Sequence, residues 1–211
     1  MFEHFTGGKP KKVAVIGCGP SMQDYVNIKA GSQAANFHVD EVWGVNLSGS
    51  VIQTNLDFVM DDHAKSISSS PEYAYFERNN GKPLVTSAPR PQCPNAVAFP
   101  LAEALAIPGA REYFNHTIAY IIAYSIIIGV EELCVFGADY ISHMKPYGAP
   151  GTDFTEPSRY MACTAYWCGI AASQGVNVIV TPNSPLLDAD RARTTGFYGY
   201  LIPPSVKYEG E

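Results

Sequence analysis

The sequence predicts an α/β fold in which a mostly parallel sheet carries helices on both faces. Short apolar runs rich in β-branched residues recur along the chain, and each leads through turn residues into a helical stretch. Most of these runs are continuously apolar, as expected of strands that are covered on both faces. Two of the helical stretches end at a glycine and pass directly into an apolar run, which is typical of parallel units.

The size and composition of the chain indicate one globular domain. It has 211 residues, of which 46% are hydrophobic and only 16% are charged. A chain of this length is long enough to bury a core, and so apolar a composition excludes an intrinsically disordered protein. We expect a single domain over residues 1–190 and a polar, proline-bearing tail over residues 191–211.

The net charge, the cysteine content and the apolar runs limit which partners and which location we expect for the protein. The formal net charge of −6 disfavours a nucleic-acid partner. Five scattered cysteines, none in a C-x-x-C pair, fit neither a disulfide framework nor a zinc site, so we expect reduced thiols and a cytoplasmic protein. The first residues lack a secretory signal, and the most apolar run, Ile118–Val130, is shorter than the ~20 residues of a membrane span. We therefore expect no membrane span.

The predicted elements follow from these runs. Six strands are predicted: Lys12–Ile16, Glu41–Val45, Phe58–Met60, Leu84–Thr86, Glu132–Phe136 and Asn177–Val180. Four helices are predicted: Pro20–Lys29, Leu101–Ala106, Thr117–Ile128 and Pro157–Gln174. Two proline-bearing stretches, Ala88–Ala98 and Ser142–Pro157, are predicted to be long loops of the kind that often cover binding sites.

A glycine-containing turn, Gly17–Ser21, follows the first predicted strand. Its two glycines let the backbone turn sharply and approach a ligand, and Pro20 suits the first position of a helix. N–H groups at a helix start favour an anion, so Gly17, Gly19 and Ser21 are predicted to hold a nucleotide phosphate, as in Rossmann-like folds. The sequence case for any nucleotide chemistry depends on amides near residue 20 that the protein's own side chains leave open. The alternative is a tight strand-to-helix turn with no ligand.

The turn departs from the pattern that binds NAD. Met22 stands where the dinucleotide pattern has its third glycine. The second strand is followed by Asn46, where an acidic residue would bind a ribose hydroxyl. Both departures disfavour NAD. Asn46 can still form a hydrogen bond to a ribose or a base.

Polar residues that directly follow the strands are candidate ligand contacts, because ligands of open α/β sheets bind beyond the carboxyl ends of the strands. They are Asn46, Asp61, Asp62, His63, Ser87, Asp139 and Asn183. Asp139 is the preferred site residue, either as an acceptor for a ligand hydroxyl or as a general base. The alternative for Asp139 is an aspartate that orders its own loop. The triplet Asp61–His63 equally fits a helix N-cap.

Further candidates lie near the same edge of the predicted sheet. His116 precedes the buried helix and His143 follows Asp139 by four residues, so either can move a proton near neutral pH or be merely solvated. Thr117 is either the N-cap of its helix or a hydroxyl that contacts phosphate. Arg90, between two prolines, is either a clamp for a phosphate or carboxylate or a surface arginine.

Three segments together resemble the bacterial sialyltransferases of the Campylobacter type: the Gly17–Ser21 turn, the Thr117–Ile128 helix that leads into Glu132–Asp139, and Pro182–Leu187. They look equally like a wider group of Rossmann-like proteins that includes hydroxymethylpterin diphosphokinase-like enzymes and uncharacterised phage-encoded proteins. The resemblance covers most of the chain thinly and depends on the order and spacing of the segments. It implies a Rossmann-like, nucleotide-binding transferase, in the host cytoplasm if phage-encoded.

The sialyltransferase resemblance also implies roles for individual residues. In that family the corresponding positions surround a cytidine monophosphate-sugar donor without a required metal. By resemblance these roles fall on Gly17, Gly19, Ser21, Asn46, Thr117 and Asp139. The chain departs from the family at Cys18, where the family has asparagine, and near Pro157, where the family's catalytic histidine falls. Either His143 or His116 has taken over that role, or sialyl transfer is not the reaction.

These observations lead to three hypotheses. The first is a glycosyltransferase with a cytidine- or uridine-type nucleotide sugar as donor substrate, no permanently bound cofactor and no metal. Its catalytic residues would be His143, His116 and Asp139, with Ser87, Arg90 and Asn183 among the binding residues. The second is a diphosphokinase that uses ATP and a metal held by Asp61 and Asp139. The third is a non-catalytic phage accessory protein that retains the fold. A homo-oligomer is compatible with all three.

Overall fold

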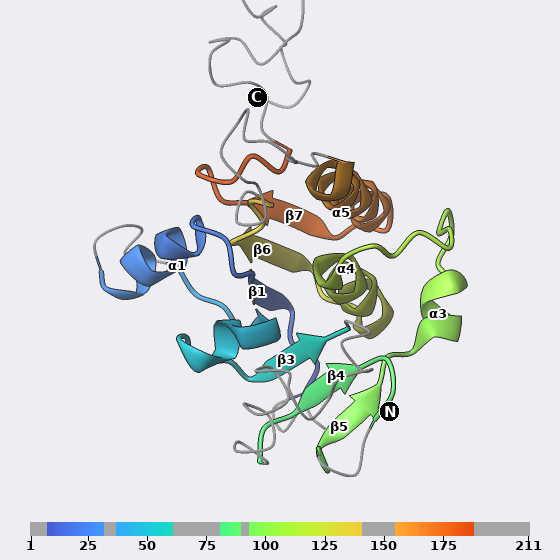
Figure 1. Cartoon of the computed structure of the whole chain (residues 1–211), viewed down its shortest axis with the longest axis horizontal. Coiled ribbons are helices and arrows are strands. Elements are labelled where there is room, and N and C mark those ends of the chain that lie inside the picture. The colour runs from blue at the N-terminus through green and yellow to red at the C-terminus, as the bar shows by residue number, and fades with distance from the viewer. Residues whose placement is uncertain (1–7, 32–36, 61–80, 90–92, 141–154, 188–211) are drawn as a thin grey trace, which may run out of the picture.

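The computed structural model describes residues 8–31, 37–60, 81–89, 93–140 and 155–187. Within them one sheet contains seven strands, and every neighbouring pair is parallel (Figure 1). The strands are β1 (Lys12–Ile16), β2 (Glu41–Val45), β3 (Leu56–Val59), β4 (Leu84–Thr86), β5 (Ala96–Ala98), β6 (Glu132–Phe136) and β7 (Asn177–Val180). Their order across the sheet is β5-β4-β3-β2-β1-β6-β7. The predicted Rossmann-like α/β fold is confirmed.

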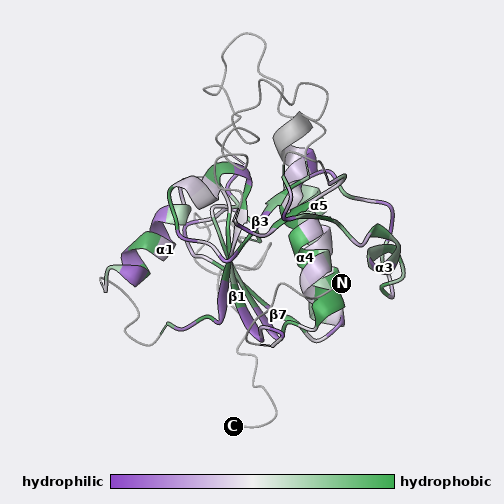
Figure 2. Ribbon diagram, turned by 90° about the horizontal axis from the view of Figure 1, so that it is seen from below, coloured by the Kyte–Doolittle hydropathy of each residue, from purple (hydrophilic) through white to green (hydrophobic). Residues whose placement is uncertain are grey.

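Helices cover both faces of this sheet (Figures 1 and 2). They are α1 (Met22–Lys29), α3 (Leu101–Leu105), α4 (Thr117–Ile128) and α5 (Thr155–Ser173), and a 3₁₀ turn, η1 (Asn46–Ser50), follows β2. Figure 2 shows α1 on one side of the sheet and α4 and α5 on the other. No helix in the described part of the chain is long and apolar enough to cross a membrane.

The strands are continuously apolar because each face of the sheet has its own core. In β1, Val13 and Val15 pack in the core on the α4 and α5 side, whereas Ala14 and Ile16 pack with Tyr25 of α1. Burial of each large apolar side chain contributes about 1.5–3 kcal/mol to folding. The helix α4 is buried on nearly every side, as its composition predicts.

Several predicted segments differ from the structure, two of them in proline-bearing stretches. The stretch Ala88–Ala98, predicted as a loop, ends in the edge strand β5, which pairs in parallel with β4. Its three residues are too few to give a pattern. The helix α5 begins at Thr155, before Pro157, because a proline is tolerated in the first turn of a helix.

The chain order creates a switch point in the sheet. From β1 the chain continues through β2 to β5 on one side, and it later returns to place β6 on the other side of β1. The carboxyl ends of β1 and β6 therefore bound the position where α/β proteins of this topology bind ligands.

Candidate functional site

The amides of the glycine turn already bind the protein's own acceptors. The N–H of Gly17 donates to the Phe136 carbonyl at 2.8 Å, and that of Gly19 donates to the Gly137 carbonyl at 2.9 Å. The N–H of Ser21 donates to Asp139 Oδ2 at 2.7 Å. The expectation that the amides near residue 20 are open to a phosphate is therefore wrong for this conformation, because a carboxylate of the protein occupies the anion position.

The two glycines are required by the close approach of the loop that follows β6. A Cβ atom on Gly17 would clash with the backbone of Gly137, and one on Gly19 would clash with the Asp139 carboxylate. Gly137 itself has a φ of 71° and would clash in turn with Gly17. The tight-turn alternative thus accounts for both glycines without a ligand.

Ser21 joins this contact through its side chain as well. It is the N-cap residue of α1, and its Oγ accepts a hydrogen bond at 2.9 Å from the Gly137 N–H. Together with the Asp139 bond, this fixes the start of α1 to the loop after β6. A carboxylate at a helix N-terminus is also favoured by the helix dipole, by about 0.3–1 kcal/mol. Ser21 therefore joins two segments of the chain.

Asp139 has one oxygen that this arrangement does not use. The residue is only 2% exposed, and its Oδ1 has no hydrogen-bond partner among the described residues. An unpaired buried acceptor costs about 1–3 kcal/mol, so such atoms call for a structural or functional explanation. A hydroxyl or amino group of a ligand would supply the missing donor.

Two other unpaired buried acceptors lie at the same edge of the sheet. Asn46 Oδ1 follows β2 directly, and Thr86 Oγ1 belongs to the last residue of β4. Asn46 also has a φ of 50°, the left-handed region that asparagine tolerates better than most residues. Since β2 and β6 flank β1, Asn46 and Asp139 follow the two strands on either side of β1.

His116 lies beside the loop that carries Asp139. Its ring is 5.0 Å from that of Tyr140 and 5.2 Å from that of Tyr160, measured between centroids. The Tyr140 hydroxyl donates to Thr164 Oγ1 at 2.5 Å, and burial raises the pKa of Tyr140 well above its usual range. The Asp139 loop is thus anchored on the side of α5.

A hydrogen bond from the first turn of α4 holds His116 in place. It is the N-cap of α4, and its Nδ1 accepts from the Ile118 N–H at 3.3 Å. A neutral ring with this bond carries its proton on Nε2. Thr117, predicted as a candidate N-cap, is instead the first residue of the helix and is 3% exposed.

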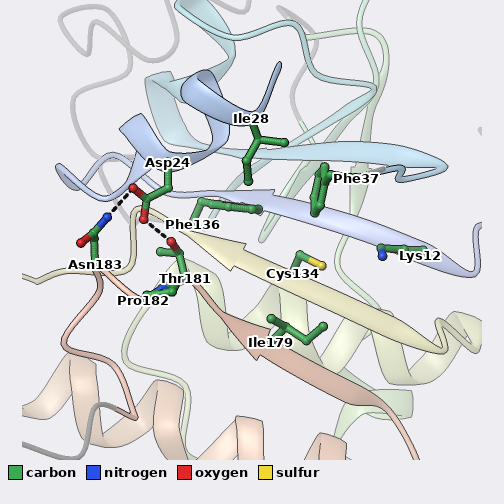
Figure 3. Close-up of a pocket in the computed structure, with 10 residues that line it drawn as sticks. All are labelled: Lys12, Asp24, Ile28, Phe37, Cys134, Phe136, Ile179, Thr181, Pro182 and Asn183. Carbon is green, nitrogen blue, oxygen red and sulfur yellow. Dashed lines mark hydrogen bonds between the residues drawn. The ribbon is translucent and has the colours of Figure 1, made fainter. Parts of the chain in front are cut away.

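The remaining candidates are dispersed. Ser87 is exposed after β4. Asn183 donates through Nδ2 to Asp24 Oδ1 at 2.5 Å, and the Thr181 hydroxyl donates to Asp24 Oδ2 (Figure 3). Asn183 therefore binds α1 rather than Asp139. Arg90, His143, Asp61, Asp62 and His63 lie outside the described residues.

Sequence reasoning missed two polar residues of this region. Thr86 was placed within a strand, and only its position as the last residue of that strand marks it as a candidate. Asp24 is 7% exposed and lies in the first turn of α1, where an acidic residue is ordinarily taken to favour the helix dipole. In the described part of the chain no group of three His, Cys, Asp or Glu side chains is arranged to hold a metal.

Comparisons with known proteins add no assignment. No family model matches the chain. Neither the curated proteins nor the solved structures contain a match.

Proposed function

We propose that the protein binds a nucleotide sugar of the cytidine or uridine type at the carboxyl ends of β1, β2 and β6, and that it transfers the sugar to a hydroxyl acceptor. The observation that carries this proposal is the buried, unpaired Oδ1 of Asp139 at the switch point of the sheet. Sugar and ribose hydroxyls are donors that match it.

We assign the ligand's hydroxyl groups, and not its phosphate, to Asp139 and Asn46. Asp139 Oδ1 and Asn46 Oδ1 are both acceptors, so together they favour a ligand with several donors. A phosphate placed on the Ser21 amide would have to displace the Asp139 carboxylate, since that amide is already bound at 2.7 Å. We therefore place the phosphate away from the glycine turn.

The proposed reaction assigns one proton to Asp139. The acceptor hydroxyl oxygen attacks the anomeric carbon of the donor sugar, and the bond from that carbon to the phosphate oxygen breaks. The nucleotide leaves with the bonding electron pair, and the proton of the acceptor passes to Asp139 Oδ1.

Calorimetry with cytidine and uridine nucleotides tests the proposal. The full chain should bind at least one of them, and Asp139→Asn should weaken binding by roughly 10- to 100-fold, as expected for a hydrogen bond to a charged group. Glu103→Gln, an exposed acidic residue on α3, is the matched control and should bind as the native chain does. Absence of binding of any nucleotide at millimolar concentration would overturn the proposal. Binding of ATP alone, dependent on magnesium, would favour the diphosphokinase instead.

A further inference from the structure

The loop after β6 that carries Asp139 is tied to helices on both faces of the sheet. On the α1 side, Asp139 Oδ2 accepts a hydrogen bond at 2.7 Å from the Ser21 N–H. On the other side, the hydroxyl of the next residue, Tyr140, donates to Thr164 Oγ1 of α5 at 2.5 Å. Figure 2 shows α1 and α5 on opposite sides of the sheet. The loop is therefore held from two directions at adjacent residues.

The backbone of this loop is strained at Tyr140. Its φ is 55°, which lies in the left-handed region that glycine adopts readily and that a bulky residue rarely adopts. A residue keeps such a conformation only where the surrounding structure imposes it. Residues of this kind cluster at ligand-binding and catalytic sites, so the strain directly beside Asp139 calls for a functional explanation.

The side chain of Tyr140 supplies the contacts that impose this conformation. It is 5% exposed and packs in the core on the α4 and α5 side. Its hydroxyl is bonded to Thr164, which is 0% exposed, and its ring lies edge-on to that of His116 at 5.0 Å between centroids. Because Tyr140 adjoins Asp139 in the chain, a fixed tyrosine restricts rotation of the backbone that carries the carboxylate.

We propose that Tyr140 is a positioning residue for Asp139. Anchored to α5, it keeps Asp139 Oδ2 on the Ser21 amide and leaves Oδ1 without a partner among the described residues, ready to accept from a ligand hydroxyl. A carboxylate held in this way needs no reordering when the ligand arrives. Without the anchor the backbone would relax, and the buried oxygen would turn to water or to another donor. The inference rests on the proposed function for the identity of the ligand.

Hydrogen exchange of the Ser21 amide tests the anchor without any ligand. Tyr140→Phe keeps the ring and removes only the hydroxyl. In this variant the Ser21 amide should exchange roughly tenfold faster relative to the Gly17 amide, as expected when about one hydrogen bond no longer holds the Asp139 carboxylate in place. Tyr166→Phe is the matched control, since it removes another tyrosine hydroxyl, which donates to a backbone carbonyl at 2.7 Å, and it should leave this ratio unchanged. An unchanged ratio in Tyr140→Phe would overturn the inference.

Calorimetry with the cytidine and uridine nucleotides tests the link to the ligand. Tyr140→Phe should weaken binding by roughly fivefold to tenfold in the native chain. In the Asp139→Asn background the same change should have almost no further effect, because Tyr140 acts through Asp139. Thr164→Val removes the same hydrogen bond from the side of α5 and should reproduce both results.

The two measurements separate this inference from the proposed function. If no nucleotide binds to the native chain, the proposed function fails, and exchange of the Ser21 amide still decides whether Tyr140 positions Asp139. If nucleotide binds and Tyr140→Phe weakens it equally in both backgrounds, Tyr140 only supports the fold and the inference is overturned.

Discussion

Two buried carboxylates, Asp57 and Asp139, lie in the same sheet but in different electrostatic surroundings. Asp57 is 0% exposed in β3 and accepts from Thr54 Oγ1 at 2.7 Å through Oδ1. In the described part of the chain its Oδ2 has no hydrogen bond, as Asp139 Oδ1 has none, but it forms an ion pair with Lys82 Nζ at 2.8 Å. Asp139 is 2% exposed, and no ion pair to it is found among the described residues. Both have glycines beside them whose missing side chains make room for the carboxylate.

The difference indicates which carboxylate serves the fold and which serves the site. A buried charge with a counter-charge and a hydrogen bond is compensated within the protein. A buried carboxylate with one unused oxygen remains incomplete until another donor arrives. We therefore assign Asp57 a structural role and Asp139 a role in binding.

The largest change in the free energy of unfolding is expected at the ion pair of Asp57 and Lys82. Lys82→Ala should leave the Asp57 carboxylate buried without its counter-charge and lower the free energy of unfolding by about 3–5 kcal/mol. Urea denaturation of the native chain and the variant measures this difference. A loss below about 1 kcal/mol would remove the contrast between the two carboxylates, because it would fall in the range of a surface ion pair.

A smaller loss of stability is expected when the Asp139 carboxylate is displaced from the glycine turn. Gly19→Ala introduces a Cβ that clashes with Asp139, and overpacking of this kind costs about 1–3 kcal/mol. Gly169→Ala is the matched control, since this exposed glycine in α5 has open space around it and should gain about 0.5–1 kcal/mol from better helix propensity. Equal stabilities of the two variants, measured by thermal denaturation, would contradict the packing of Asp139 on the turn.

The smallest change in stability is expected at Asp40, a carboxylate on the surface. Asp40 is exposed, and hydrogen bonds from the Lys12 and Lys11 N–H groups lower its pKa. A lowered folded-state pKa gives stability that is present above the unfolded value and is lost as the pH falls through the folded value. Asp40→Asn should therefore flatten the acid limb of the stability curve below about pH 4, with little change from pH 6 to pH 8. An unchanged acid limb would show that these bonds do not contribute.

How much the sequence predicts differs between the fold and the site. The strands that run through Val13 and Leu133 were predicted with their observed bounds, because each is a continuous apolar run. Strand β3 was predicted to begin at Phe58 because the charge of Asp57 interrupts its apolar pattern. The sequence gives no sign that Lys82, 25 positions further along the chain, compensates that charge.

The same limit applies to the glycine turn. Its position after β1 was predicted correctly, because local composition determines a strand-to-helix turn. The bond from the Ser21 N–H to the Asp139 carboxylate was not predicted. Asp139 stands 118 positions further along the chain and reaches Ser21 only when β6 pairs with β1. Contacts between distant segments determine whether an anion site is open, and no local pattern reports them.

The most direct measurement compares Asp57→Asn and Asp139→Asn in both stability and nucleotide binding. Asp57→Asn should unfold at a lower urea concentration, and its folded fraction should bind cytidine or uridine nucleotide as the native chain does. Asp139→Asn should keep nearly native stability and lose most of that binding. Loss of stability without loss of binding in Asp139→Asn would contradict the account, because it would make Asp139 a second structural carboxylate.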